Sequence, residues 1–202
     1  MNAPTRMNEV TPQTVEFKLD QKTIHAFEGE TIFKAAKRHG IDIPHLCYKD
    51  GYRADGNCRA CVVEIKGERT LAPSCCRNVT AGMEVQANSD RAVKSQKMVL
   101  EMLLSDMPDT GYKWNEADES QQHGELSDWA ARMDVTARPE LKALRREQPK
   151  ADISHPAMAV NLDACIQCNR CVRACREEQV NDVIGYAMRG SHSEIVFDIG
   201  DA

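Results

Sequence analysis

Nine cysteines fall into two groups, and cysteine thiolates at such spacings are the ligands that iron–sulfur clusters use. The first group lies within residues 47–76 and the second within residues 165–175 of the 202-residue chain, with no cysteine between them. Residues 1–6 lack the apolar stretch of a signal peptide, which favours a reducing, cytoplasmic location. There, an odd number of cysteines points to ligands or catalytic thiols rather than a disulfide framework. We therefore expect two ligand-bearing modules and a connector.

The first group has the spacing Cys47-x10-Cys58-x2-Cys61-x13-Cys75. A 2Fe-2S cluster is held by four thiolates, and three closely spaced cysteines can wrap it with one loop while a distant fourth ties that loop to a sheet. Gly56 fits such a loop, because glycine lets the backbone approach the sulfurs closely. Ten residues between the first two cysteines, rather than four, indicate a long-loop relative of the plant-type ferredoxins.

Two neighbouring cysteines, Cys75 and Cys76, compete for the fourth position. With Cys75 as the ligand, Cys76 is expected to be a small buried residue. The alternative is a zinc knuckle on Cys58, Cys61, Cys75 and Cys76. It is disfavoured because adjacent cysteines rarely bind one tetrahedral zinc without strain, and Cys47 would be unused.

The second group, Cys165-x2-Cys168-x2-Cys171-x3-Cys175, has the spacing of a bacterial ferredoxin run and predicts a 4Fe-4S cluster. Three cysteines on one loop can hold three corners, and the fourth, expected to open a helix, usually serves a second cluster. Arg176 stands where proline is usual at a helix start. Only one run is present, so Cys175 either closes the same cluster or serves one completed by further sequence, which we favour.

Arginines surround the second run, and two interpretations of them stay open. Arg170, Arg173 and Arg176 either offset the negative charge of cluster and thiolates and raise the reduction potential, or are solvated and pair with Glu177 and Glu178.

Short elements must position the first group of cysteines. Alternating apolar residues predict strands at 15–19 and 24–27 joined by a turn at 20–22. Thr31 as N-cap and Gly40 after the last turn predict a helix between them. Further strands are expected at 62–65 and 83–85. Together these predict an α+β, β-grasp-like domain with a helix packed on a small mixed sheet.

The expected organisation is a tail at 1–13, a 2Fe-2S ferredoxin-type domain at 14–90, a helical, acidic connector at 91–155 and a partial 4Fe-4S ferredoxin-type domain at 156–202. An amphipathic helix is expected at 91–105, docked on a neighbouring core through Val93, Met98, Val99, Leu100, Met102 and Leu103. Short helices are expected at 125–133 and 140–147.

The composition excludes several functions. A net charge of -5 disfavours a nucleic-acid binder with a broad basic surface, and no stretch is long and apolar enough for a membrane span. Nucleotide-binding glycine motifs and the H-E-x-x-H metal motif are missing, and no nucleophile–base pair can be argued, so we predict no catalytic site in this chain. His45 either donates a hydrogen bond to a cluster sulfur or is a plain loop histidine, which we favour.

Residues 15–85 resemble the N-terminal 2Fe-2S domain of the complex I large peripheral-arm subunit. The resemblance is carried by residues 44–47 (PHLC), residues 56–61 (GNCRAC) and residues 73–75 (PSC). It implies that Cys75 rather than Cys76 is the fourth ligand. Residues 161–171 (NLDACIQCNRC) resemble the ferredoxin domain that follows in that family.

The family normally has a further 4Fe-4S segment with one histidine and three cysteines between these domains. Residues 104–135 contain no cysteine, which argues against complex I proper and against the diaphorase subunit of NAD-reducing hydrogenases. The chain resembles instead the α subunit of cytosolic, NAD-dependent molybdenum formate dehydrogenase. There, a second cysteine run and a molybdopterin domain follow.

The resemblance implies an electron-transfer module with one 2Fe-2S and one 4Fe-4S cluster. It would pass electrons between a formate-oxidising molybdopterin domain in further sequence and flavin- and NAD-binding or small iron–sulfur partner subunits. The alternatives are a diaphorase-type subunit of an NAD-reducing hydrogenase or complex I relative, and a zinc-stabilised interaction module without a redox role.

Overall fold

The computed structural model describes residues 13–108, 124–147 and 160–197. Three predicted segments therefore fall largely or partly outside the described residues: the tail at 1–13, the connector at 91–155 and the C-terminal domain at 156–202. The N-terminal elements are β1 (Thr14–Leu19), β2 (Lys22–Phe27), α1 (Ile32–Arg38), β3 (Val62–Ile65), β4 (Ala72–Pro73) and β5 (Glu84–Gln86). The middle of the chain forms α2 (Asp90–Ser105), α3 (Glu125–Arg132) and α4 (Pro139–Lys142). The C-terminal elements are α5 (Arg170–Arg173), the π-helical turn η2 (Ala174–Glu178), β6 (Ile184–Ala187), the 3₁₀ turn η3 (Gly190–His192) and β7 (Glu194–Phe197).

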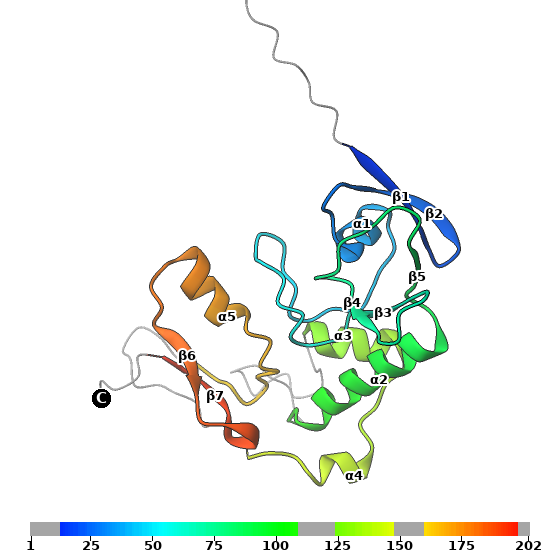
Figure 1. Ribbon diagram of the computed structural model, residues 1–202. Helices are drawn as coiled ribbons and strands as arrows, with labels where there is room; N and C mark the ends of the chain where they lie inside the picture. Colours follow the sequence, from blue (N-terminus) through cyan, green and yellow to red (C-terminus); the bar gives the residue numbers. More distant parts are fainter. Residues whose placement is uncertain (1–12, 109–123, 148–159, 198–202) are drawn as a thin grey trace, which may run out of the picture.

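Five strands form one small mixed sheet in the order β2-β1-β5-β3-β4. β1 and β5 run parallel, and the other pairs are antiparallel. The apolar face of α1 shares one core with the sheet, in which Phe17, Ile32 and Val85 are buried. The mixed α/β domain with a helix on a small sheet, which the alternating residues predict, is therefore confirmed (Figure 1).

The β1–β2 hairpin is closed by a tight turn. Asp20 and Gln21 adopt left-handed backbone conformations with φ of 47° and 68°, which match the twist of a two-residue hairpin. The Asp20 carboxylate accepts hydrogen bonds from the backbone N–H groups of Ala87 and Asn88, at 2.8 and 3.2 Å. The turn thus ties the hairpin to the end of β5.

Local signals also set the ends of α1. The Thr31 hydroxyl accepts a hydrogen bond from the Lys34 N–H at 3.3 Å, and Gly40 follows the helix with φ of 69°. His39 is the C-cap residue. The predicted helix and both of its ends are confirmed.

The long helix α2 lies where it is predicted, but its expected buried face is wrong in part. Met98 and Met102 are 48% and 58% exposed, whereas Gln96 is buried. The Gln96 amide donates hydrogen bonds to the carbonyls of Val62 and Ala87, at 2.9 and 3.2 Å. A polar residue faces the sheet because two strand-end carbonyls satisfy its amide, and apolar periodicity cannot reveal such partners.

The two predicted short helices differ in outcome. The helix expected at 125–133 is present as α3 and packs against α2, with Trp129 buried. The helix expected at 140–147 is too long, because α4 ends at Lys142. Beyond it the chain turns so that the Arg146 guanidinium can reach carbonyls of the C-terminal segment.

The C-terminal segment has little core of its own. β6 and β7 form an antiparallel hairpin, and the buried residues of this segment are Val172, Arg173, Cys175 and Ile195. In Figure 1 the cyan loop between α1 and β3 extends toward the orange helix α5. The segment is therefore held by contacts with the N-terminal domain as well as by its own hairpin.

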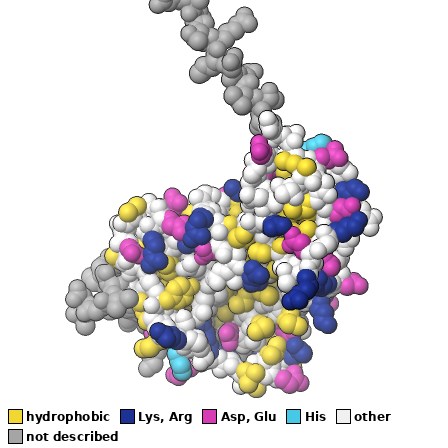
Figure 2. Space-filling model, in the orientation of Figure 1, with side chains coloured by type: hydrophobic (Ala, Val, Ile, Leu, Met, Phe, Trp, Pro, Cys, Tyr) yellow, Lys and Arg dark blue, Asp and Glu magenta, His cyan; other side chains and the backbone are white. Residues whose placement is uncertain are grey.

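None of the described helices is long and apolar enough to cross a membrane. On the face in Figure 2, basic and acidic side chains are interspersed rather than gathered into one field.

Candidate metal centres

The first group of cysteines is assembled by a loop and a strand pair. Cys47, Cys58 and Cys61 lie on the connection between α1 and β3, and Cys75 directly follows β4. Because β3 and β4 are paired, with Val62 opposite Pro73, the register brings Ser74 opposite Cys61 and places Cys75 next to this end of the pair. Cys47, Cys61 and Cys75 are each 1% exposed, and Cys58 is half-buried.

The buried Ser74 fixes this arrangement. Its hydroxyl and its N–H both donate to the Cys61 carbonyl, at 2.7 and 3.1 Å.

The structure brings the four predicted sulfurs together. The thiols of Cys58 and Cys75 lie close enough to that of Cys47 to change its pKa, and the Cys75 thiol likewise acts on the pKa of Cys61. Backbone N–H groups also point at the sulfurs, as in the 3.4 Å contact from the Cys47 N–H to the Cys58 sulfur. Such N–H groups stabilise negative charge on thiolates and on a cluster that they hold.

The four thiols do not release their protons equally. Hydrogen bonds from the thiols of Cys58 and Cys75 lower the pKa of Cys47, and a hydrogen bond from Cys75 lowers the pKa of Cys61 to about 7. Those same contacts raise the pKa values of Cys58 and Cys75, with burial adding to the rise. Two sulfurs thus carry negative charge readily, which favours metal binding because the thiolate is the ligand form.

Cys76 does not occupy the predicted environment. It is exposed rather than buried, and its sulfur lies 3.6 Å from that of Cys75. A Cβ atom added to Gly56, whose φ is 63°, would lie 3.0 Å from the Cys76 sulfur. Adjacent side chains in this turn point in different directions, so Cys75 enters the core while Cys76 lies outside over the glycine.

His45 lies in the loop between α1 and β3, as the favoured interpretation predicts, and its ring makes contacts that the sequence does not reveal. Its Nδ1 lies 2.9 Å from the Ile43 carbonyl oxygen, and its ring packs edge-on against Phe33 and Trp129, with centroids 4.7 and 5.8 Å away. The histidine therefore joins the N-terminal domain to α3 through aromatic contacts.

In the second run, three cysteines lie near one another. Cys165 and Cys168 are half-buried, and Cys171 is exposed. The pKa of Cys171 is raised, first by the partial burial of its sulfur and then by the negative charges of Cys168 and Cys165. Burial, and then the charges of these same three sulfurs, raise the pKa of Tyr186 to about 12. Cys165, Cys168 and Cys171 therefore lie near enough for their charges to act on one another and on Tyr186 of β6.

Cys175 lies one helical turn further on and is buried. Its sulfur accepts a hydrogen bond from the Val183 N–H at 3.3 Å. The helix begins at Arg170 and continues through η2 to Glu178, so the expectation that Cys175 opens a helix is wrong. Arg176 consequently lies inside a helical turn and pairs with Asp182 at 2.7 Å.

The arginines of the second run contact the N-terminal domain. Arg173 is 2% exposed, and its guanidinium donates to the carbonyls of Cys47 and Arg53. Arg170 donates to the Tyr48 carbonyl at 2.7 Å and pairs with Glu125 at 2.5 Å. The two residues are therefore not the solvated partners of Glu177 and Glu178.

Two side-chain amides link the cysteine groups further. The Asn57 amide donates to the Gln167 carbonyl at 2.9 Å, and the Asn169 amide donates to the Asp55 carboxylate at 2.8 Å. Sequence reasoning missed this interface. The one signal for it is the ten-residue spacing between Cys47 and Cys58, whose inserted loop makes these contacts.

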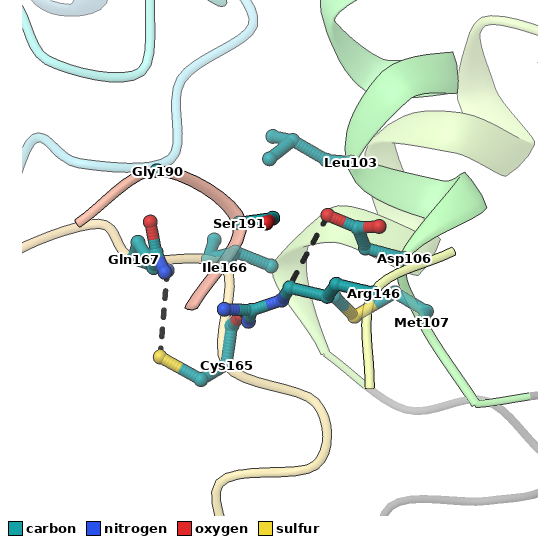
Figure 3. Close-up of a pocket in the computed structure, with 9 residues that line it drawn as sticks. All are labelled: Leu103, Asp106, Met107, Arg146, Cys165, Ile166, Gln167, Gly190 and Ser191. Atoms are coloured by element: carbon teal, nitrogen blue, oxygen red, sulfur yellow. Dashed lines mark hydrogen bonds and ion pairs between the residues drawn. The ribbon is translucent and has the colours of Figure 1, made fainter. Parts of the chain in front are cut away.

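Arg146 is another residue that the sequence did not single out. It lies in a cavity of about 190 Å³ beside Cys165 (Figure 3). Its guanidinium donates to the carbonyls of Cys165 and Ser193 at 2.9 and 3.0 Å. Its Nε lies 3.9 Å from the Asp106 carboxylate. The arginine holds the start of the second cysteine loop against the η3 turn.

The donor set can be tested against an iron–sulfur cluster. Within the part of the chain that the structure describes, no three His, Cys, Asp or Glu side chains are arranged to hold a metal ion. The fit to a cluster rests instead on four neighbouring sulfurs, on the two thiols, Cys47 and Cys61, that lose protons readily, and on the N–H groups around them. Thiolates so arranged are the donors that a 2Fe-2S cluster takes.

Comparisons with known proteins agree with this site. Residues 12–90 match the model of the 2Fe-2S iron–sulfur cluster binding domain. The chain is 38% identical, over 85% of its length, to the NADP-reducing hydrogenase subunit HndD of Solidesulfovibrio fructosivorans. It is 32% identical, over 90% of its length, to the mitochondrial NADH-ubiquinone oxidoreductase 78 kDa subunit of Candida albicans. It spans only 29% and 25% of those two relatives.

A solved structure, an NAD+-reducing NiFe-hydrogenase in the H2-reduced state, matches 91% of this chain and 74% of its own chain, with 28% identity and a TM-score of 0.75. The fold and the four-cysteine site define a ferredoxin-type 2Fe-2S domain. In particular, residues 12–90 match a 2Fe-2S iron–sulfur cluster binding domain, and the chain as a whole is similar to the matching parts of NADH-ubiquinone oxidoreductase and hydrogenase subunits.

Proposed function

We propose that this chain is an electron-transfer module of a multisubunit oxidoreductase. A 2Fe-2S cluster would be held by Cys47, Cys58, Cys61 and Cys75. The observation that carries the proposal is the contact of these four sulfurs within a domain whose family model is a 2Fe-2S cluster binding domain. When bound, such a cluster accepts and donates electrons, while the protein sets its position, burial and potential.

A 4Fe-4S cluster on Cys165, Cys168 and Cys171 is the second part of the proposal. Its support is the ferredoxin-type spacing and the closeness of the three sulfurs. Cys175, which lies apart with its sulfur toward Val183, would serve a neighbouring cluster completed by further sequence. The proposed division of the chain is the 2Fe-2S domain at 14–90, the connector at 91–155 and the 4Fe-4S domain at 156–202.

Two kinds of enzyme are candidates for the complex in which this chain works. The cysteine-free stretch at 104–135 favours a formate dehydrogenase α subunit, with molybdopterin chemistry outside this chain and flavin- or NAD-binding partners in the cytoplasm. The names of the relatives, which are hydrogenase and NADH-quinone oxidoreductase subunits, favour the second candidate, an electron-transfer subunit of a hydrogenase or complex I relative. Both candidates assign the chain the same electron-transfer role.

Metal analysis of the full chain tests the proposal. The chain is purified without oxygen and reconstituted, iron, sulfide and zinc are assayed, and EPR spectra are recorded before and after dithionite. We expect a reducible 2Fe-2S signal with about two irons per chain, because the proposed 4Fe-4S site takes only three cysteines from this chain. About six irons with a stable 4Fe-4S signal would contradict the assignment of Cys175 to a neighbouring cluster and show that it closes its own, and stoichiometric zinc without iron would contradict the redox function.

A further inference from the structure

We propose that Arg173 is a positioning residue that joins the two cysteine groups and raises the reduction potential of the 2Fe-2S site. The inference rests on the proposed function only as far as the 2Fe-2S cluster. It assigns a role to a residue of the second run that acts on the first.

Arg173 belongs by sequence to the second group, since it lies between Cys171 and Cys175. Its contacts, however, are with the loop between Cys47 and Cys58. The guanidinium donates to the carbonyl of Cys47 and to that of Arg53, and it lies 5.9 Å from the centre of the Tyr52 ring.

Burial makes the charge of Arg173 effective. The side chain is 3% exposed, and an arginine stays protonated in proteins, so a full positive charge is held where solvent screens it weakly. Its Nη2 donates directly to the carbonyl of a cysteine in the first group. Reduction adds negative charge to a cluster, and a nearby buried cation favours that state, which raises the reduction potential.

The charges around Arg173 identify its counterpart. The Asp55 carboxylate lies 3.6 Å from Nε and is itself bound by the Asn169 amide. Nε makes no hydrogen bond, so this pairing is incomplete. Asp55 also pairs with Arg53, which in turn pairs with Glu177 at 3.1 Å. The Asp55 carboxylate therefore offsets part of the effect of Arg173. Removing the arginine should lower the reduction potential, and removing the carboxylate should raise it.

Surface charges of the same helical segment provide a control. Arg176 is 57% exposed and pairs with Asp182, so its charge is solvated. Removing it changes the net charge of the chain by the same amount as removing Arg173. If only the buried position matters, the Arg176 variant leaves the 2Fe-2S potential unchanged.

The experiment is an EPR-monitored redox titration of the reconstituted full chain. We expect Arg173→Met to lower the 2Fe-2S midpoint potential by an amount equal to at least a tenfold change in the reduction equilibrium, or about 59 mV for one electron. Arg173→Lys keeps the charge and is expected to restore most of the potential. Asp55→Asn is expected to shift the potential upward, and Arg176→Met to leave it in place.

Several results would overturn the proposal. An intact 2Fe-2S signal at the wild-type potential in Arg173→Met would show that the charge does not act on this site. Equal shifts in Arg173→Met and Arg176→Met would show a general effect of net charge. If Arg173→Met does not hold the cluster, the opposite shift of Asp55→Asn decides, and an unchanged potential there refutes the electrostatic role. Wild-type chain without any 2Fe-2S signal would contradict the proposed function instead.

Discussion

The two cysteine groups are held by different amounts of secondary structure and buried core. The first lies on the edge of a five-stranded sheet with a core shared by α1, and three of its four cysteines are almost completely buried. The second lies on a loop, a short helix and a two-stranded hairpin, with few buried apolar residues of its own. A small domain needs a core to fix its ligands, so the second group depends on docking against the first.

The largest effect is expected from the fourth ligand of the first group. Cys75→Ser should abolish the 2Fe-2S signal, because it removes a buried sulfur that contacts those of Cys47 and Cys61. The adjacent Cys76→Ser is the matched control, since Cys76 is exposed and should leave the cluster in place. Iron and sulfide assays with EPR after dithionite measure both variants. Loss of the cluster in Cys76→Ser alone would reverse the assignment of the fourth ligand.

Truncating one buried residue in each region should have a smaller effect, on stability, and should show whether the two cores unfold separately. Leu19 is fully buried in the sheet core, so Leu19→Ala should lower the free energy of unfolding of the N-terminal domain by about 2–5 kcal/mol. Ile195→Ala removes a buried residue of the hairpin and should weaken that segment without changing the stability of the sheet.

Denaturant unfolding together with hydrogen exchange resolved by peptide tests this pair. Faster exchange in the N-terminal sheet for Ile195→Ala would contradict the separation and show one cooperative unit, whereas Leu19→Ala can affect both regions because the second docks on the first.

The docking of the second region on the first should respond to a single amide. Asn57→Ala removes the hydrogen bond to the Gln167 carbonyl, which should cost about 1 kcal/mol and speed hydrogen exchange in residues 165–173. Asn88→Ala is the matched control, because that amide contacts only the Asp20 side chain on the opposite part of the domain. Unchanged exchange at 165–173 in Asn57→Ala would mean that the arginines and the Asn169 amide hold the interface without it.

The smallest expected effect is a pH dependence confined to the first region. Burial raises the pKa of Glu30, but hydrogen bonds from the Arg38 guanidinium and the Phe27 N–H outweigh it, so the pKa is lowered. A lowered folded-state pKa contributes stability above the unfolded-state pKa, and that stability is lost as the pH falls through the folded-state pKa.

Glu30→Gln should therefore lower the free energy of unfolding by about 1 kcal/mol at pH 7, and the difference from wild type should shrink below about pH 4. Urea unfolding at several pH values measures it. A difference that stays constant down to about pH 2 would contradict the ion pair as its source.

Several features follow from the sequence because their causes are local. Cysteine spacing, the alternation in β1 and β2, and the Thr31 and Gly40 signals at the ends of α1 each depend on neighbours within a few residues. Such patterns are read directly from the chain, since backbone geometry relates adjacent residues in a fixed way. The sheet domain and the loop that carries Cys58 and Cys61 were predictable on this basis, whereas the preference for Cys75 over Cys76 came from the family resemblance.

Other features were settled only by the tertiary structure, because they depend on partners far along the chain. Gln96 is buried because the carbonyls of Val62 and Ala87 accept hydrogen bonds from its amide. The face of α2 that carries Gln96 therefore packs inward, and the face that carries Met98 and Met102 is exposed. Arg173 is buried because a loop about 120 residues earlier presents carbonyls to it. The sequence does not reveal which distant groups will hydrogen-bond a charged or polar side chain. Only the tertiary structure shows whether that side chain finds its partners in the protein interior or in water.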